Sequence, residues 1–332
     1  MNQPNGSGWP EVVCLGEVLT DFVALDSAVP LQQATNFHRA AGGAPANVAA
    51  ALARLGIHVA FIGKVGGDAF GLSLRETLAA EGVDTRGLLE APTARSALAF
   101  VGSDGHGGRE FVFYHQGMAD TLLRPEEVDR DLIANAGIFH FGSVTLAAEP
   151  SRTATAAAAR WAREHGCLVS FDPNVRLEVW DSPRQALDSM IEMLSIVDVV
   201  KVSSDELTFL TGTSDASAAC RVLRAHGPTV AIVTQGGGGC YYQTVTASGH
   251  VAGIPVASVD SLGAGDAFVA GLLAGLSAHP DRTAVSDEAL LVPALRFANA
   301  VGAITTTQYG AIPALPTRAQ VETLLQTAQP LT

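Results

Sequence analysis

The sequence lacks any concentration of positive charge. Its 332 residues include 33 Asp and Glu against 20 Lys and Arg, which gives a formal net charge of −13 with His neutral. The acidic residues are spread along the chain rather than clustered. Proteins that bind nucleic acids or anionic membranes use patches of basic residues. We therefore expect neither partner, and an anionic nucleotide would have to be held by backbone amides, a metal ion and a few cations.

Cysteine is scarce, and its spacing fits neither a disulfide framework nor a metal site. The four cysteines lie far apart, without a C-x-x-C pair or Cys/His ligand spacing: Cys14, Cys167, Cys220 and Cys240. Cys14 and Cys167 lie in apolar strand-like runs, which predicts buried core thiols and a reducing compartment. The first ten residues lack the basic and apolar parts of a signal peptide, and no apolar run looks long enough to span a bilayer. We expect a cytoplasmic protein.

The segment Asp260–Phe268, D-S-L-G-A-G-D-A-F, matches neither the P-loop nor the dinucleotide-binding pattern. It opens the most apolar helical run of the chain, Ala264–Leu276. Backbone N–H groups at a helix start have no intrahelical partner and lie at the positive end of the helix dipole. The amides of Gly263, Ala264 and Gly265 are therefore predicted to hold an anion such as a phosphate.

Asp266 lies in the first turn of this predicted helix. A carboxylate beside a bound phosphate is unfavourable unless it takes part in chemistry, for example by removing a proton from an attacking hydroxyl. We therefore predict phosphoryl transfer to an alcohol, with Asp266 as the base. The alternative is a tight turn in which Asp266 only favours the helix dipole.

Strands and helices alternate through most of the chain, which predicts an α/β fold with a mostly parallel sheet covered on both faces. Strands are expected at 138–141, 167–171, 197–202 and 229–234, and helices at 150–165, 183–194, 216–225, 264–276, 290–304 and 317–326. We expect a single domain over residues 1–332, with a small β lid at about 18–40 and 96–116. Ligands of such sheets bind beyond the carboxyl ends of the strands, where Asp172, Thr234 and Asp260 are expected.

Two motifs in the right order resemble the signatures of the ribokinase-like (PfkB) sugar kinases: G-G-A-P-A-N at Gly42–Asn47, and D-x-x-G-A-G-D-x-F at Asp260–Phe268. The resemblance extends nearly from end to end. It implies a doubly covered α/β sheet with a β lid over the sugar, and ATP, Mg²⁺ and K⁺ as cofactors. The blocks Ser170–Trp180 and Phe297–Ala303 look like the bacterial fructokinase branch.

The resemblance implies transfer of the γ-phosphoryl group of ATP to a primary hydroxyl, with D-fructose giving fructose 6-phosphate. A 2-keto-3-deoxygluconate kinase, a ribokinase and another PfkB-type sugar or nucleoside kinase remain alternatives. So does a non-catalytic sugar-binding protein, although such a protein would be expected to have lost Asp266 or a glycine of the anion hole. An NAD-dependent dehydrogenase is disfavoured because no early G-x-G-x-x-G is present.

Three segments supply candidate sugar ligands in addition to Asp266. Gly42 and Gly43 allow close approach of the backbone, and Asn47 offers a donor and an acceptor to sugar hydroxyls. A Gly-Gly turn with Asn47 near a helix start is the alternative. By resemblance, Asp21 binds adjacent sugar hydroxyls, unless it faces solvent from an edge strand. Arg176 is expected to donate hydrogen bonds to phosphate or sugar oxygens, and the alternative is a surface salt bridge.

The resemblance also implies a nucleotide site and two ion sites. Expected nucleotide ligands are Asn174, Thr234, Gly236, Gly238, Gly263, Gly265 and Asn299, the last of which could instead be a polar residue on a helix flank. Glu206 is expected to orient Mg²⁺ through water, although Ser203 replaces the Asn of the family's N-x-x-E motif and Asp205 is the next candidate. Expected ligands of a monovalent cation are Asp260, Leu262, Thr305, Gln308 and Gly310.

Aromatic residues recur on the predicted lid strands. Phe111 and Phe113 are expected to share one face. Phe100, Phe113 and Tyr114 could cover the sugar, or pack as a dimer face. Because a small lid with an exposed apolar side tends to pair, we expect a homodimer formed through the lid.

Overall fold

The computed structural model describes residues 8–26, 29–103, 109–277 and 282–328. Its main sheet has nine strands in the order β13-β12-β11-β10-β9-β8-β1-β4-β5. The neighbours pair in parallel except at one edge, where β12 is antiparallel to β11 and β13 is antiparallel to β12. The strands are β1 (Val12–Leu15), β4 (Val59–Gly66), β5 (Leu88–Ala91), β8 (Ile138–Gly142), β9 (Leu168–Asp172), β10 (Val199–Ser203), β11 (Val230–Thr234), β12 (Gly239–Gln243) and β13 (Ser248–Ala252).

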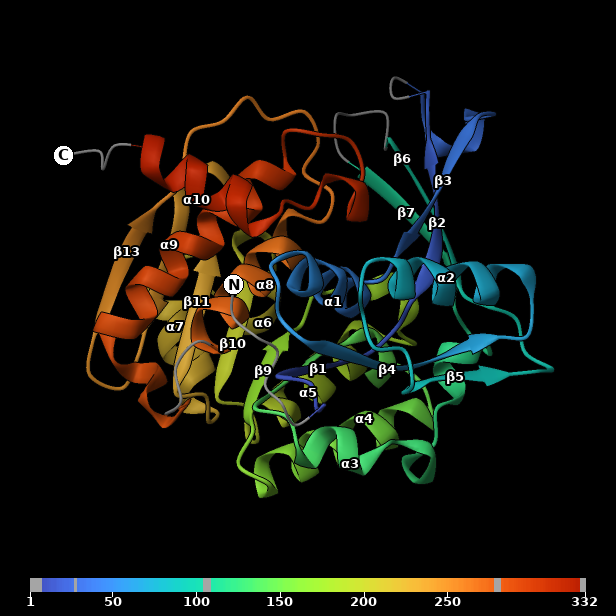
Figure 1. Ribbon diagram of the computed structural model, residues 1–332, viewed down its shortest axis with the longest axis horizontal. Coiled ribbons are helices and arrows are strands. Elements are labelled where there is room, and N and C mark those ends of the chain that lie inside the picture. Colours follow the sequence, from blue (N-terminus) through green and yellow to red (C-terminus); the bar gives the residue numbers. More distant parts are fainter. Residues whose placement is uncertain (1–7, 27–28, 104–108, 278–281, 329–332) are drawn as a thin grey trace.

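Helices cover both faces of this sheet (Figure 1). One face carries α1 (Ala44–Arg54), α2 (Ala69–Ala80), α8 (Ala264–Ser277), α9 (Glu288–Thr305) and α10 (Arg318–Thr327). The other carries α3 (Arg130–Ala134), α4 (Ser151–Glu164), α5 (Pro183–Leu194), α6 (Leu207–Thr211) and α7 (Ala216–Ala225). Along β1, Val12 and Cys14 pack into the first core while Val13 and Leu15 pack into the second. The predicted doubly covered α/β fold is confirmed.

Short 3₁₀ helices lie in the connections between these elements. They are η1 (Leu31–Gln33), η2 (Ala119–Leu122), η3 (Pro125–Glu127), η4 (Val144–Leu146), η5 (Leu177–Val179), η6 (Ser204–Glu206), η7 (Gly236–Gly238), η8 (Arg282–Ser286) and η9 (Ile312–Ala314).

Several helices begin where a side chain can accept from an unpaired backbone N–H. Asp68 caps α2 by accepting from Gly71 N at 2.9 Å. Ser182 and Asp215 cap α5 and α7 in the same way. Such caps stabilise the start of a helix. The expected helices at 183–194 and 216–225 match α5 and α7 in both bounds.

Helix α9 bears on the expectation that no apolar run is long enough to span a bilayer. By length and composition alone this 18-residue helix is long and apolar enough to cross a membrane. The expectation that no apolar run has this length is therefore wrong. Half of the helix is buried within the protein, where Leu291, Leu295 and Ala298 join the same core as α8. Its apolar side chains therefore have an ordinary place in the packed interior.

A second, four-stranded sheet stands to one side of the main sheet, at the upper right of Figure 1. Its order is β3-β2-β6-β7, formed by β2 (Leu19–Ala24), β3 (Phe37–Gly42), β6 (Leu98–Ser103) and β7 (Arg109–Tyr114). Residues 104–108, between β6 and β7, lie outside the described part of the chain. We call this sheet the lid. Strand β3 leads directly into α1 through Gly43, whose φ of 103° favours glycine.

Asp172 and Thr234 end β9 and β11, as expected for the carboxyl edge of the sheet. Asp260 does not follow a strand, because β13 ends at Ala252 and the next eight residues are irregular. Asp260 is instead held beside the end of α9, where Val259 N and Asp260 N both donate to Thr306 O at 2.7 and 3.1 Å. The expectation that Asp260 lies at the carboxyl end of a strand is therefore wrong.

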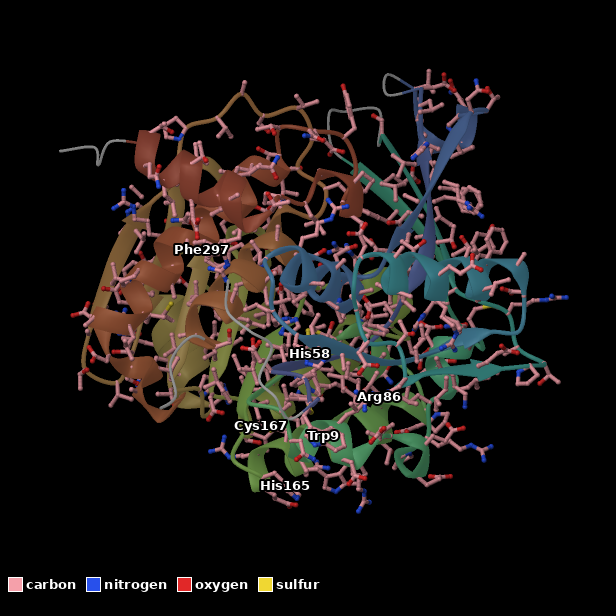
Figure 2. The ribbon with its side chains drawn as sticks, viewed as in Figure 1. Trp9, His58, Arg86, His165, Cys167 and Phe297 are labelled. Carbon is pink, nitrogen blue, oxygen red and sulfur yellow. The ribbon has the colours of Figure 1, made fainter. Side chains whose placement is uncertain are left out.

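All four cysteines are buried and free of disulfides, which confirms the prediction for Cys14 and Cys167. Cys167 lies beside α3, where its Sγ donates to Ile133 O at 3.3 Å (Figure 2). Figure 2 also labels Trp9 and Arg86, whose guanidinium lies 5.6 Å from the Trp9 ring centroid. This contact ties the start of the described chain to the edge of the main sheet.

Candidate active site

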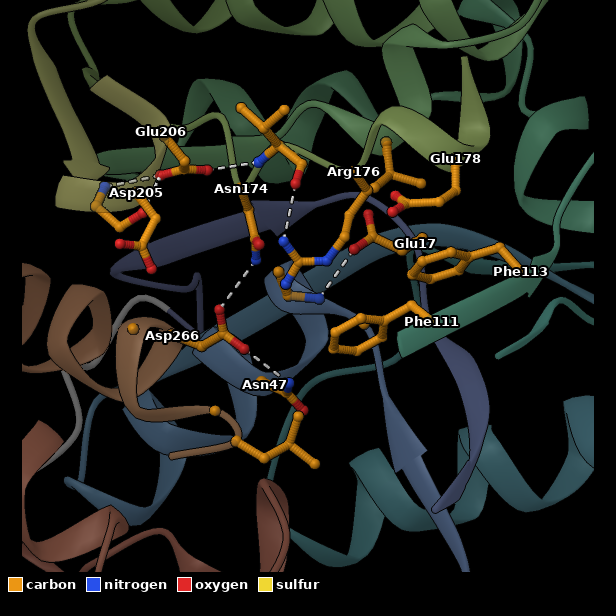
Figure 3. Close-up of a pocket in the computed structure, with 18 of the residues that line it drawn as sticks. Glu17, Asn47, Phe111, Phe113, Asn174, Arg176, Glu178, Asp205, Glu206 and Asp266 are labelled. Carbon is orange, nitrogen blue, oxygen red and sulfur yellow. Dashed lines mark hydrogen bonds between the residues drawn. The ribbon is translucent and has the colours of Figure 1, made fainter. Parts of the chain in front are cut away.

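A cavity of about 660 Å³ lies between the lid and the start of α8. Asp21 lines it from the lid. Phe111 and Phe113 also line it from the lid, and Asp266 lines it from α8 (Figure 3). Arg176 enters from the loop after β9. The volume is in the range of small-molecule sites. The two glycine-rich motifs, which are far apart in the sequence, therefore meet at one cavity.

Asp266 is buried at the first turn of α8 and is held by two amides (Figure 3). Asn47 Nδ2 donates to Oδ2 at 2.8 Å, and Asn174 Nδ2 donates to Oδ1 at 3.4 Å. Burial raises the pKa of Asp266 to about 6; the hydrogen bond from Asn47 lowers it, the charge of Asp172 raises it, and Lys201 lowers it. A carboxylate with a pKa near 6 is ionised at neutral pH and can accept a proton.

The start of α8 presents two glycines to the cavity, Gly263 and Gly265. Gly263 has φ 76°, and a Cβ there would lie 2.8 Å from Ala311 Cβ, so glycine is needed. The third predicted amide differs, because Ala264 N donates to Ser261 O at 3.3 Å and Ala264 is not among the residues that line the cavity. The predicted anion site would thus be formed around the glycines on either side of Ala264.

Asp21 on β2 and Gly42 on the adjacent strand β3 lie close together as diagonal neighbours. A Cβ on Gly42 would lie 2.0 Å from Asp21 Oδ2, so only glycine leaves room for this carboxylate. Burial and the charge of Asp266 raise the pKa of Asp21 to about 7, against the opposing effect of Arg176. Gly43 and Asn47 line the cavity beside them. The solvent-facing alternative for Asp21 does not hold.

Asn47 is turned toward Asp266 rather than standing free for a ligand. Its Nδ2 is used by Asp266, while its Oδ1 is buried without a hydrogen-bond partner among the described residues. An orphaned buried acceptor costs free energy. A ligand hydroxyl is a suitable donor for this oxygen. Of the two sugar contacts predicted for Asn47, the structure therefore fits the one in which Oδ1 accepts a hydrogen bond.

Arg176 contacts its own loop and the lid. Its Nη1 donates to Val175 O at 2.9 Å, and its guanidinium carbon lies 5.2 Å from the centroid of the Phe111 ring. It makes no salt bridge with another described residue, so the surface ion pair is not observed. The guanidinium therefore retains donors at the cavity.

Glu206 has a different local role from the one expected. Oε1 accepts from Val175 N at 2.6 Å, and Oε2 accepts from Ser203 N and Ser203 Oγ at 2.7 and 2.9 Å. The carboxylate thus joins the loop after β9 to the end of β10. Ser203, which stands at the family's Asn position, is the N-cap residue of η6 and forms a capping box with Glu206. Glu206 and Asp205 still line the cavity, where their carboxylates offer the oxygen ligands that Mg²⁺ favours.

Four of the predicted nucleotide ligands do not line the cavity: Thr234, Gly236, Gly238 and Asn299. Thr234 Oγ1 donates to Val202 O at 3.3 Å. Asn299 Nδ2 donates to Val251 O and Ala252 O, both at 3.1 Å, so the amide fixes β13 against α9. Gly236 and Gly238 form the exposed turn η7. Asn174 does line the cavity, with φ 41°.

The proposed cation ligands are partly brought together. Asp260 Oδ1 accepts from Leu262 N at 3.0 Å and Oδ2 accepts from Gly310 N at 2.9 Å, so one carboxylate joins two loops. Thr305 is buried and Gln308 is exposed. Within the described ranges, no group of three or more His, Cys, Asp or Glu side chains could hold a metal ion. Any cation here would depend on backbone carbonyls.

The lid aromatics separate onto two faces. Phe111 and Phe113 stack with centroids 6.0 Å apart and line the cavity, as expected for one strand face. Phe100 and Tyr114 lie on the opposite face, where their centroids are 5.9 Å apart. The prediction that Phe100 and Tyr114 cover the sugar is therefore wrong, because side chains of successive strand residues point to opposite faces.

Glu17 and Lys201 are among the cavity residues that were not predicted from the sequence. Glu17 accepts from Ala44 N at 2.9 Å through Oε1, while Oε2 has no hydrogen-bond partner within the described residues. Burial raises its pKa to about 7. Lys201 lies on β10 and contacts Asp172 Oδ2 at 2.9 Å. The signal available was a lone charge beside or within an apolar strand, as in V-V-K-V-S.

Comparison with known proteins identifies the family of this chain. The model of the pfkB family carbohydrate kinases matches residues 10–318. The chain belongs to the pfkB family. It is therefore a carbohydrate kinase, a phosphotransferase with an alcohol group as acceptor, as the motifs predicted.

Individual pfkB relatives resemble the chain over nearly its whole length. Probable fructokinase-7 of Arabidopsis thaliana is 45% identical over 321 residues, which cover 96% of this chain and 93% of the relative. The crystal structure of fructokinase with bound ATP from Xylella fastidiosa has a TM-score of 0.85 and 38% identity, covering 95% of this chain and 98% of its own. A double-mutant fructokinase from Vibrio cholerae O395 in fructose-, ADP- and potassium-bound form has a TM-score of 0.85 and 36% identity, covering 95% and 97%.

Proposed function

We propose that this enzyme is an ATP-dependent fructokinase that converts D-fructose to fructose 6-phosphate. The observation that carries the proposal is Asp266, a buried carboxylate at the start of α8 that faces a cavity shared with Asp21 and Asn47. The fructokinases among its relatives, one of which holds fructose and ADP, support fructose as the acceptor.

Fructose would lie under the lid, with its 6-hydroxyl near Asp266. The Asp21 carboxylate accepts from sugar hydroxyls, and Asn47 Oδ1 gains the hydrogen-bond donor that it lacks among the described residues. Phe111 and Phe113 cover the apolar side of the ring and exclude water. Arg176, stacked on Phe111, keeps donors for phosphate or sugar oxygens.

Transfer then follows from the position of Asp266. The carboxylate takes the proton of the 6-hydroxyl as the oxygen bonds to the γ-phosphorus, while the bond from that phosphorus to the bridging oxygen of ADP breaks. The free N–H groups and dipole at the start of α8, next to Gly263 and Gly265, stabilise the charge that spreads over the phosphoryl oxygens.

Magnesium fits the oxygen-rich end of the cavity. The carboxylates of Glu206 and Asp205 line it, and Glu206 is oriented by three donors from Val175 and Ser203. Bound Mg²⁺ would neutralise part of the charge of the nucleotide phosphates. Glu206 would hold the ion through water while it keeps the β9 and β10 loops together.

The proposal also includes further nucleotide ligands and a monovalent cation. Thr234, Gly236 and Gly238 would lie along the nucleotide beyond the cavity, and a K⁺ ion would lie beside the loops that Asp260 joins. The potassium-bound Vibrio cholerae relative supports the cation. We also propose a cytoplasmic location, because the four cysteines are all buried and form no disulfide.

A homodimer formed through the outer face of the lid is part of this proposal. Phe22 stacks on Phe100 at 5.1 Å, and Tyr114 packs on the same ring from the other side. Tyr114 is 56% exposed and Val112 is 39% exposed, so an aromatic sheet face is left open to solvent. A second copy of the same face is the occupant that we propose.

The deciding experiment is an ADP-release assay with ATP and a panel of fructose, ribose, 2-keto-3-deoxygluconate and adenosine. We expect the highest kcat/KM with fructose. A higher value with 2-keto-3-deoxygluconate or ribose would replace fructose as the acceptor. Fructose binding without ADP release would contradict the kinase mechanism and favour a sugar-binding protein.

A further inference from the structure

The chain contains two lysines, and their surroundings differ sharply. Lys64 is 8% exposed, and its Nζ contacts Leu122 O at 3.2 Å and the two carboxylate oxygens of Glu127 at 2.6 and 2.7 Å. Lys201 is 6% exposed, but within the described residues its Nζ has one hydrogen-bond partner, Asp172 Oδ2 at 2.9 Å. A buried ammonium has three protons to place. Lys201 therefore has unused donors, whereas Lys64 has none.

The unused donors of Lys201 lie at the anion site. Lys201 lines the cavity, and a Cβ on Gly265 would lie 3.1 Å from its Nζ. Gly265 is the second residue of α8 and precedes Asp266. The absence of a side chain at Gly265 thus leaves the ammonium beside the first turn of α8, where the phosphoryl group is expected.

The charge of Lys201 is maintained by its neighbours. Burial lowers its pKa, but the carboxylates of Asp172, Glu206 and Asp266 outweigh this effect, and the pKa is raised overall. Lys201 is therefore a fixed cation surrounded by acids. A phosphoryl oxygen would supply the acceptor that its other protons lack.

On the basis of the proposed kinase function, we propose that Lys201 is a catalytic residue that donates hydrogen bonds to the phosphoryl group during transfer. Asp266 receives the hydroxyl proton, and Lys201 keeps its own protons while charge accumulates on the phosphoryl oxygens. The family's Asn two positions along the strand is Ser203 here, and its hydroxyl is already used by Glu206. Lys201 supplies a donor that this position no longer offers.

The competing explanation is that Lys201 only holds Asp172 and the loop that follows it. The two roles differ in what each stabilises. A structural lysine would support nucleotide binding and transfer to the same degree, whereas a phosphoryl ligand would act mainly on the transition state. The experiment must therefore compare these two states of the nucleotide.

We would prepare Lys201→Met and Lys201→Arg, with Lys64→Met as a matched control that removes the other buried lysine. For each variant, kcat and KM for ATP are measured with fructose. Calorimetry then gives the Kd of ADP with fructose, without and with fluoroaluminate, a mimic of the phosphoryl group in transfer. For Lys201→Met we expect kcat to fall by about 10²–10³-fold and the tightening by fluoroaluminate to be lost, while the Kd of ADP alone changes by less than about threefold.

Lys201→Arg is expected to recover part of the fluoroaluminate effect, because it restores a cation. Lys64→Met should lower Tm and retain kcat.

The inference would be overturned by a near-normal kcat in Lys201→Met. It would also be overturned if this variant bound ADP and ADP with fluoroaluminate more weakly by the same factor. If Lys201→Met does not fold, the same measurements are made on Lys201→Met with Asp172→Asn, which removes the unpaired acid. A wild-type enzyme inactive on all sugars would instead refute the proposed function.

Discussion

Asn47 Nδ2 donates a 2.8 Å hydrogen bond to Asp266 Oδ2, which joins two residues 219 positions apart. Asn47 lies on α1 directly after the lid strand β3, and Asp266 lies in the first turn of α8. Because α1 and α8 pack against each other in one core, the bond links the proposed sugar-binding segment to the proposed phosphate-binding segment. The two sequence motifs of the family are therefore parts of one hydrogen-bonded unit.

The first prediction concerns Asp266→Asn, which removes the proposed base without changing its size. We expect kcat with fructose to fall by about 10²–10⁴-fold. The folded-state pKa of about 6 lies above the ordinary value of 3.8, so the ionised group destabilises the folded state above about pH 6 and this effect is lost as the pH falls. The variant should therefore have a Tm at least equal to that of the wild type above neutral pH.

Activity and thermal unfolding are measured on the same preparations, with Asp188→Asn as the control. Asp188 makes an exposed ion pair with Arg184 on α5 and does not line the cavity. Near-normal turnover in Asp266→Asn would refute its role as the base.

The second prediction concerns the pH dependence of the reaction. Since Asp266 must be ionised to accept a proton, kcat should fall as the pH drops through about 6. Asn47→Leu removes the hydrogen bond that lowers this pKa, so the acidic limb should move to higher pH. Asp172→Asn removes a charge that raises it, so the limb should move to lower pH.

The measurement is kcat against pH at saturating fructose and ATP for all three proteins. Asn47→Leu also loses a proposed sugar contact, which is why kcat rather than kcat/KM is compared. Limbs at the same pH in all three proteins would mean that a group other than Asp266 controls turnover.

Much of the fold was predictable because local signals agreed with the packing. Helix α7 begins after a capping Asp215 and is followed by Gly227, and both bounds were predicted. Strands β3 and β5 were missed, since β3 is half-exposed and mixes His38 and Arg39 with alanines. The antiparallel strands β12 and β13 were missed because the glycines at 236–239 were interpreted only as a nucleotide loop.

The site was predictable where a motif marked it and not where the sheet register created it. Asp266, Asn47 and Asp21 lie in or beside recognisable motifs, and they meet at the cavity. Lys201 lies beside Asp172 because β9 and β10 are adjacent in parallel register, which no spacing in the sequence reveals. Asn299 lies in a family-like block, but its amide is used by the backbone of β13.

A third prediction tests the lid as a dimer face. Tyr114→Asp places a charge on the exposed aromatic side of β7, so we expect the dimer Kd to rise by roughly thirtyfold or more, as for loss of a hot-spot residue worth about 2 kcal/mol. Val245→Asp is the control, because Val245 is 63% exposed in the turn between β12 and β13, at the far edge of the main sheet. Sedimentation velocity over a concentration series measures both. A wild-type protein that stays monomeric throughout would contradict the dimer itself.

A fourth prediction tests the monovalent cation. The rate is compared in potassium and tetramethylammonium chloride at equal ionic strength, for the wild type and for Asp260→Ala. Asp260 accepts from Leu262 N and Gly310 N, so its removal should loosen both loops and abolish activation by potassium. Equal wild-type rates in the two salts would show that no such activation exists.

The last prediction uses the contact between Gly42 and Asp21 to test the sugar end of the cavity. In Gly42→Ala the new Cβ would lie 2.0 Å from Asp21 Oδ2, so the carboxylate must move. If Asp21 binds fructose, KM for fructose should rise by about 10-fold or more, as for loss of a hydrogen bond to a charged group, while KM for ATP changes little. In an Asp21→Ala background there is no carboxylate to displace, so Gly42→Ala should add little. This double-mutant cycle separates displacement of Asp21 from general damage to the lid, since additive effects of the two substitutions would mean that Gly42 acts independently of Asp21.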